Sequence, residues 1–214
     1  MSPEEFNRKE MEAGRLTQAM LDAAAARGGI VAVQRAYGLA ADGLAGVRTQ
    51  QILGALAAGK TPIPTGNAGV DAVYGKFPYT EGSSGRINIS PAWVAENIVT
   101  VKLHTGKSVR LHKLVAQEFV ALFEAACKAS GYTPASVQTF VPRHTLWNPS
   151  KSLSLHSWGI AIDFDPSSNP MGGKNSKLRT PTGQAFVKVF TDAGWTWGGA
   201  WKMKDDMHFQ RAYP

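Results

Sequence analysis

The stretch Ser154-Leu155-His156-Ser157-Trp158-Gly159-Ile160-Ala161-Ile162-Asp163-Phe164-Asp165 decides how the chain is interpreted. Its second half alternates apolar with small or acidic residues, which predicts a β-strand with one apolar face and one face that carries Asp163 toward a cavity. His156 lies seven residues earlier, so an unbroken strand would point it to the opposite face. We therefore expect a bend at Gly159, a residue type that tolerates unusual backbone angles, to bring His156 from a loop.

A second segment, Asp205-Asp206-Met207-His208-Phe209, supplies another histidine with carboxylates close by. Its alternation predicts that His208 projects from a strand next to the first one in a sheet. Two imidazoles and a carboxylate are the ligand set of a catalytic zinc centre that keeps one position for water. A nearby carboxylate can then take the proton of that water, and Asp205 is the candidate for this base, with Asp206 as the alternative.

These residues resemble a known family, the zinc D-alanyl-D-alanine carboxypeptidases and L-alanyl-D-glutamate endopeptidases. The chain carries its first signature as Ser154-x-His156-x-x-Gly159-x-Ala161-x-Asp163 and its second as Asp205-x-x-His208. The resemblance covers roughly the last two-thirds of the chain. It implies that His156, Asp163 and His208 hold Zn²⁺ and that Asp205 is the base. Phage endolysins of this family use Asp rather than Glu at the base position, as this chain does.

The resemblance also suggests substrate contacts. In the family an arginine upstream of the first zinc ligand holds the substrate carbonyl or carboxylate, and Arg143 has that position here. Members often carry Gly-Tyr-Arg after a helix, whereas this chain has Gly131-Tyr132-Thr133. Ser154 is a candidate for a hydrogen bond to substrate, with a local backbone bond as the alternative. Trp158 and Trp197 are candidates for walls of the cleft, with core packing as the alternative.

Composition indicates a globular protein: 43% of the 214 residues are hydrophobic and 18% are charged. The N-terminus lacks a basic run followed by an apolar core, and no segment approaches the about 18 apolar residues that span a bilayer. We therefore expect that the protein does not insert into a membrane. We also expect that it is made in the cytoplasm of a bacterial host, without a signal peptide. Cys127 is the single cysteine, so no internal disulfide is possible.

The first residues predict a small helical module. We expect a helix over residues 6–26, a second apolar segment over 30–39, and a last helix that opens near Thr49. Gln34, followed by Asp42-Gly43-x-x-Gly46-x-x-Thr49, resembles the mark of the three-helix peptidoglycan-binding module, with a helical cap that binds nothing as the alternative. Residues 61–70 have the Pro and Gly density of a linker. The expected domains are thus 1–60, a linker over 61–70, and 71–214.

The larger domain is predicted to be α+β, a small antiparallel sheet with flanking helices. Ile98 to Leu103 indicates a strand paired with the segment around Val109 and Leu111. A long helix with apolar residues from Val115 to Ala126 should end at Gly131, and another around 186–190 should end near Gly194. Residues 167–176 should form a loop beside the site.

The distribution of charge along the chain narrows the classes of binding partner that we expect. Of the net charge of +7, +6 falls on residues 66–214. The basic residues are scattered and form no run or aromatic-basic motif, so we expect no nucleic acid and instead a bacterial wall with acidic polymers. We expect a monomer that acts on peptidoglycan at the cell wall.

The resemblance implies cleavage of peptidoglycan stem peptides, and we expect an L-alanyl-D-glutamate endopeptidase, a phage-type endolysin. A carboxypeptidase would need a fixed cation for the terminal carboxylate, and Arg143 alone would have to serve both this group and the oxyanion. The alternatives are a D-alanyl-D-alanine carboxypeptidase and a non-catalytic wall-binding protein with a structural metal. A closed structural site usually has four protein ligands, whereas only three are evident.

Overall fold

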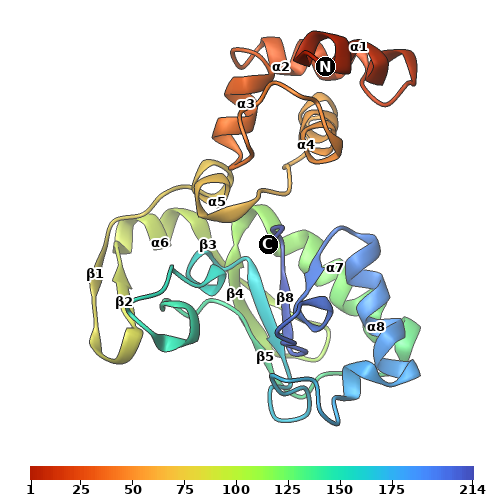
Figure 1. Cartoon of the computed structure of the whole chain (residues 1–214). Coiled ribbons are helices and arrows are strands. Elements are labelled where there is room, and N and C mark those ends of the chain that lie inside the picture. The colour runs from red at the N-terminus through yellow and green to blue at the C-terminus, as the bar shows by residue number, and fades with distance from the viewer. The chain divides into compact units, whose positions relative to one another are not determined.

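The computed structural model describes residues 1–214 and divides into two compact units. Unit 1 comprises Met1–Lys76 together with Ala212–Pro214, and unit 2 comprises Phe77–Arg211. Helices make up the regular structure of unit 1, while small antiparallel sheets with flanking helices make up unit 2 (Figure 1). The predicted α+β class is confirmed. No helix is both long and apolar enough to cross a membrane.

Unit 1 contains helices α1 (Pro3–Glu12), α2 (Gln18–Ala25), α3 (Ile30–Ala36), α4 (Val47–Ala57) and α5 (Gly66–Tyr74). Its buried core consists of Leu16, Ala24, Val33, Ala45, Ile52 and Leu53. The prediction of a single helix over residues 6–26 was wrong. Gly14 adopts a φ of 69°, and the side chain of Thr17 caps a new helix by accepting a hydrogen bond from the Met20 amide at 3.3 Å. The chain therefore turns between α1 and α2.

The residues that resemble a wall-binding motif form one hydrogen-bond network. Nε2 of Gln34 donates to Oδ1 of Asp42 at 2.9 Å and to Oγ1 of Thr49 at 3.2 Å, and its Oε1 accepts from the Gly43 amide at 2.9 Å. Because Gln34 is buried, these bonds satisfy its amide and fix the turn before α4. The motif thus has a structural role in the turn.

The segment expected to be a linker contains regular structure. Helix α5 begins at Gly66, and unit 1 continues through Lys76. Thr65 forms a parallel bridge with Tyr213, and the guanidinium carbon of Arg48 lies 3.3 Å from the centre of the Tyr213 ring. Residues from both ends of the chain therefore complete unit 1.

Unit 2 contains two hairpins and one four-stranded sheet. The hairpins pair β1 (Tyr79–Glu81) with β2 (Ile87–Ile89) and β3 (Ile98–Lys102) with β4 (Ser108–His112). The second hairpin confirms the prediction, with Val101 opposite Val109 and Val99 opposite Leu111. The larger sheet has the order β5-β6-β8-β7, from β5 (Val137–Gln138), β6 (Ala161–Phe164), β8 (His208–Gln210) and β7 (Thr196–Trp197), and every neighbour is antiparallel.

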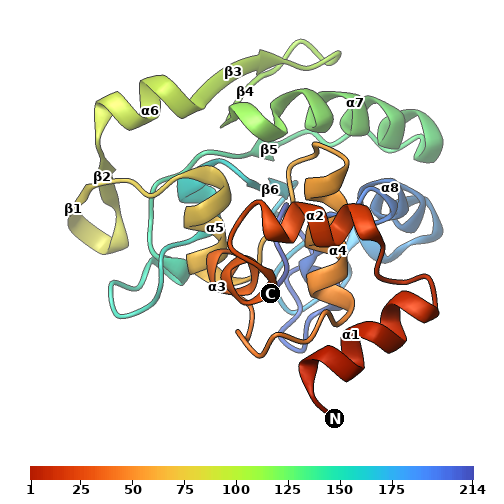
Figure 2. The same cartoon turned by 90° about the horizontal axis from the view of Figure 1, so that it is seen from above.

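Three helices accompany these strands: α6 (Pro91–Asn97), α7 (Lys113–Ser130) and α8 (Pro181–Asp192). Helix α7 ends at Gly131, which adopts a φ of 69°, and Gly194 follows α8 with a φ of 86°, so both predicted stops are confirmed. Figures 1 and 2 show α7 and α8 side by side, next to the strands of the larger sheet. A cluster of fully buried aromatic rings joins these helices to the sheet, formed by Phe119, Phe123, Phe164, Phe186, Phe190 and Phe209.

The apolar face of the sheet determines what its other face carries. Phe164 of β6 and Phe209 of β8 point into the aromatic core, with ring centres 5.3 Å apart. Successive side chains of a strand alternate between faces, so Asp163 and His208 lie on the opposite face. The packing of the core thereby orients the candidate metal ligands.

Candidate metal centre

Asp163 and His208 face each other across two neighbouring strands. Asp163 of β6 is the direct register partner of His208 of β8 in the antiparallel ladder. Directly opposed side chains on one face of such a pair lie close together, so the ladder itself brings the carboxylate to the imidazole. Oδ1 of Asp163 is 3.0 Å from Nδ1 of His208.

His156 reaches the same carboxylate from outside the sheet. It lies in the short 3-10 helix Leu155–Trp158, and Gly159 follows in the left-handed region with a φ of 68°. A Cβ at Gly159 would lie 2.8 Å from the backbone nitrogen of His112, so the turn has no room for a side chain. The predicted bend at Gly159 is confirmed, and it places Nε2 of His156 3.2 Å from Oδ2 of Asp163.

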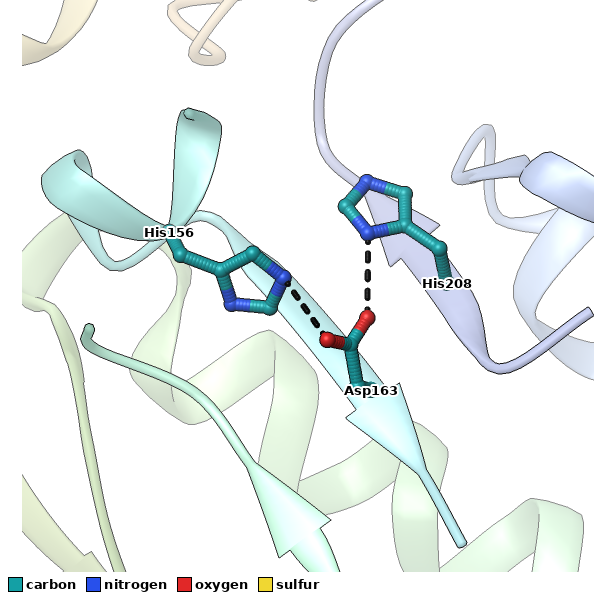
Figure 3. A group of neighbouring side chains, drawn as sticks. All are labelled: His156, Asp163 and His208. Carbon is teal, nitrogen blue, oxygen red and sulfur yellow. Dashed lines mark hydrogen bonds and ion pairs between the residues drawn. The ribbon is translucent and has the colours of Figure 1, made fainter. Parts of the chain in front are cut away.

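The three side chains form one compact group of metal-ligand atoms (Figure 3). One ligand atom from each of His156, Asp163 and His208 lies within 4.8 Å of the other two, and all three residues are buried. The two imidazole rings approach from different elements, with centres 5.2 Å apart and planes at 67°. A common ion at the centre of such a group can be bound by all three.

The outward nitrogen of each imidazole has an acceptor. Nδ1 of His156 is 2.7 Å from the carbonyl oxygen of Thr139, and Nε2 of His208 is 3.0 Å from Oε1 of Gln210. When the outward nitrogen carries the proton, the inward one presents its lone pair, which is the arrangement typical of metal-binding histidines. Nε2 of His156 is buried and makes no hydrogen bond. This donor set fits a zinc ion, since two imidazoles and a carboxylate are ligands that zinc prefers.

The ionised form of Asp163 is strongly favoured over the protonated form. Burial alone would raise the pKa of Asp163, but His156 and His208 outweigh it and hold this pKa well below its usual range. Burial likewise opposes the charged form of His208, while the hydrogen bond and charge of Asp163 raise the pKa of His208. Asp163 is therefore an anionic candidate ligand.

The two neighbouring carboxylates differ in environment. Asp206 is 0% exposed, and its Oδ1 lies 2.6 Å from Nη2 of Arg179. Asp205 has no such partner, and its Oδ1 is buried without a hydrogen bond. Burial raises the pKa of Asp205, and the charge of His208 opposes this rise, so Asp205 lies within electrostatic reach of the ligand group. Of the two candidates for the base, only Asp205 is free of an ion pair.

A cavity of about 250 Å³ opens at the ligand group. Its wall includes His156 and Asp163 together with Arg143, whose Nη2 is 4.0 Å from Oδ2 of Asp163. Burial lowers the pKa of Arg143, and the charges of Asp163 and Asp205 oppose this effect. Met171 from the loop 167–176 also lines the cavity, which confirms that this loop lies beside the site.

The structure does not bring the other predicted substrate contacts into the cavity wall. Trp158 is 2% exposed and packs on Phe77 with ring centres 4.8 Å apart. Trp197 is the register partner of Phe209, so its side chain shares the face opposite to His208. Ser154 is buried, and its amide donates to the carbonyl oxygen of Arg143 at 3.0 Å. These residues support the fold around the site.

Sequence reasoning missed several residues at the site. Trp147 and Leu146 line the cavity in place of the expected tryptophans. Thr139 acts through its backbone carbonyl, for which its residue type gives no signal. Gln210, however, lies two residues after His208 on the same strand, so period-two alternation places both side chains on one face and could have identified it.

Comparisons with known proteins agree with the ligand group. A peptidase family model described as D-alanyl-D-alanine carboxypeptidase matches residues 148–211. The match includes all three candidate ligands and Asp205, but neither Arg143 nor unit 1. No curated protein and no solved structure matches the chain. Residues 148–211 are thus similar to a peptidase domain of this kind, and they contain the candidate His-Asp-His metal site.

Proposed function

We propose that the protein is a zinc-dependent peptidoglycan hydrolase that cleaves stem peptides, most specifically as an L-alanyl-D-glutamate endopeptidase. The observation that carries this proposal is the buried group of His156, Asp163 and His208 within the segment that matches the family. The acceptors at Thr139 and Gln210 leave the inward imidazole nitrogens free to bind Zn²⁺.

Each remaining group then has a defined task. Zinc at such a site lowers the pKa of bound water to near 7 and polarises a carbonyl group. Asp205 accepts a proton from the attacking water and passes it to the nitrogen of the leaving amine. The guanidinium of Arg143 donates hydrogen bonds to the substrate carbonyl oxygen as negative charge develops there.

The basic side chains that line the cavity support cleavage of an internal bond rather than a terminal bond. Arg143 is the only arginine among the lining residues. A carboxypeptidase needs one fixed cation for the terminal carboxylate of its substrate, in addition to the donor for the oxyanion. An endopeptidase cleaves between two chain segments and needs only the donor for the oxyanion within the cavity itself.

A second candidate is cleavage of the terminal D-alanyl-D-alanine bond, which the description of the matching family favours. Mass spectrometry of digested muropeptides separates the two. The endopeptidase produces new amino-terminal D-Glu and stems that end in free L-Ala, without released D-Ala. Release of D-Ala from pentapeptide muropeptides without new D-Glu amines would replace the first proposal by the second. Zinc binding without any cleavage would indicate a wall-binding protein with a structural metal.

We further propose that unit 1 binds the cell wall and that the whole chain acts as a phage-type endolysin, made in the host cytoplasm. Two features support this: the aspartate at position 205, which phage members of the resembling family use, and the Gln34 and Asp42-Gly43 motif of unit 1. Sedimentation of the full chain with purified walls, compared with unit 2 alone, tests the binding role.

A further inference from the structure

The segment Leu146-Trp147 exposes two large apolar side chains at the cavity. Leu146 is 45% exposed and Trp147 is 42% exposed, and both line the cavity together with His156 and Asp163. Their φ angles are 55° and 57°, in the left-handed region that non-glycine residues rarely adopt. Strained backbone of this kind persists only where the surroundings enforce it, and it gathers at ligand sites.

The surroundings do enforce this conformation. The amide of His144 donates to the carbonyl oxygen of Gly85 at 2.8 Å, and the Trp147 amide donates to the carbonyl oxygen of His144 at 3.1 Å. A Cβ at Gly85 would lie 2.2 Å from the Trp147 carbonyl oxygen, so the two backbones are in close contact. The His144 ring in turn binds the carbonyl oxygen of Lys151 and the carboxylate of Glu81. The exposed indole is therefore held in place by the β1–β2 hairpin.

Two guanidinium groups accompany this indole. The guanidinium carbon of Arg86 lies 5.0 Å from the centre of the Trp147 ring, and that of Arg143 lies 5.1 Å from it. Backbone bridging between Arg86 and Arg143 keeps the two arginines adjacent. Arg143 has Asp163 at 4.0 Å, whereas Arg86 is exposed and has no carboxylate within ion-pair distance. Stacking on an aromatic ring restrains a guanidinium and leaves its planar edge available for a bidentate carboxylate.

We propose that Arg86 and Trp147 form a subsite at the edge of the cavity that binds a free carboxylate of the substrate. This rests on the proposed function, since the substrate is taken to be a stem peptide. In an L-Ala–D-Glu substrate the D-Glu residue uses one carboxyl group in the chain and keeps the other free. The subsite selects peptides in which that group is a carboxylate and disfavours those in which it is a carboxamide. Arg86 is then a specificity-determining residue outside the segment that matches the family.

The test uses two synthetic peptides that differ only in this group, a carboxylate in one and a carboxamide in the other. The full-length zinc-loaded protein should show a KM about tenfold lower for the carboxylate peptide, the scale of one charge-assisted hydrogen bond. Arg86→Gln should remove this preference by raising KM for the carboxylate peptide alone, with kcat unchanged, because the contact is equal in ground and transition states. Arg86→Lys should restore part of it.

The matched control is Arg110→Gln. Arg110 is also exposed and also lies over an aromatic ring, with its guanidinium carbon 4.8 Å from the centre of Phe140, but Phe140, unlike Trp147, does not line the cavity. This variant should keep the preference. Equal KM values of the unaltered protein for both peptides, or equal behaviour of Arg86→Gln and Arg110→Gln, would overturn the subsite.

A binding measurement separates this inference from the proposed reaction. Calorimetric titration of both peptides into the full-length Asp205→Asn protein, with and without Arg86→Gln, reports the carboxylate preference without turnover. If the unaltered protein cleaves neither peptide, the proposed function fails. Tighter binding of the carboxylate peptide that depends on Arg86 would still support the subsite, and its absence would exclude it.

Discussion

Nη2 of Arg179 lies 2.6 Å from Oδ1 of the fully buried Asp206, and this ion pair separates the roles of two adjacent carboxylates. Arg179 also donates to the carbonyl oxygen of Gly199 at 2.9 Å, and the Trp197 indole donates to the carbonyl oxygen of Asp206 at 2.8 Å. Asp206 is thus part of the packing that holds the approach to β8. Asp205, which has no ion pair, therefore remains our candidate for the base.

We predict opposite effects for the two amide substitutions. Asp205→Asn should keep zinc and the melting temperature but lose turnover by about two or more orders of magnitude, the usual contribution of a general acid-base group. Asp206→Asn should lower the melting temperature, because it leaves Arg179 without its charged partner. Zinc analysis, thermal unfolding and kcat per folded protein check both. An inactive Asp206→Asn beside a nearly normal Asp205→Asn would reverse the assignment of the base.

The ligand group predicts about one zinc ion per purified chain. Replacement of His156, Asp163 or His208 by Ala should remove most of the metal together with the activity, because each change leaves two protein ligands. Elemental analysis after dialysis gives the metal content, and Ser154→Ala serves as a control that should keep it. Near-stoichiometric zinc in His208→Ala would contradict the ligand assignment.

Gln210 should strengthen metal binding without being a metal ligand itself. Its amide oxygen faces the outward nitrogen of His208, and loss of such a partner typically weakens metal binding by about 10–100-fold. We expect Gln210→Ala to show this loss in a competition titration with a chelator, while Gln210→Glu, which keeps an acceptor, stays close to the unaltered protein. Equal affinities of all three proteins would show that His208 is oriented by the strand alone.

The two compact units predict that Phe77–Arg211 folds by itself. This fragment should cleave soluble muropeptides with the kcat/KM of the full chain, but clear intact walls about tenfold more slowly or worse, because it lacks the tethering proposed for unit 1. Turbidity loss of walls and chromatography of soluble digests measure the two activities. Equal losses on both substrates would mean that unit 1 supports the catalytic fold.

The features of the site that could be predicted from the sequence are those that have a periodic or chemical signature. Alternation along 160–165 and 206–209 predicted that Asp163 and His208 project from neighbouring strands, and Gly159 predicted the bend that admits His156. The same alternation grouped Asp165 with Asp163, but Asp165 adopts a φ of 44° after β6 and accepts hydrogen bonds from Tyr132, Ala135 and Ser136 instead.

Other features have no signature of this kind. Left-handed backbone at Leu146 and Trp147 depends on contacts with Gly85, which lies far away in the sequence. Tryptophans were expected at the cavity, and Trp147 lines it rather than Trp158 or Trp197. The break at Gly14 was missed because its neighbours keep helical apolar spacing, while the cap by Thr17 decides the boundary.

The bridge between Thr65 and Tyr213 has a consequence for folding during synthesis. Chains emerge from the ribosome with their amino-terminal residues first, and domains generally fold in that order. Helices α1 to α5 therefore emerge before the catalytic residues. The contact of Tyr213 with Pro64 and Thr65, however, can form only after all of unit 2 has been translated. Unit 1 is thus the first to begin folding and the last to be completed. If a ribosome stalled while translating unit 2, the nascent chain would contain the helices of unit 1 without the contact between Thr65 and Tyr213.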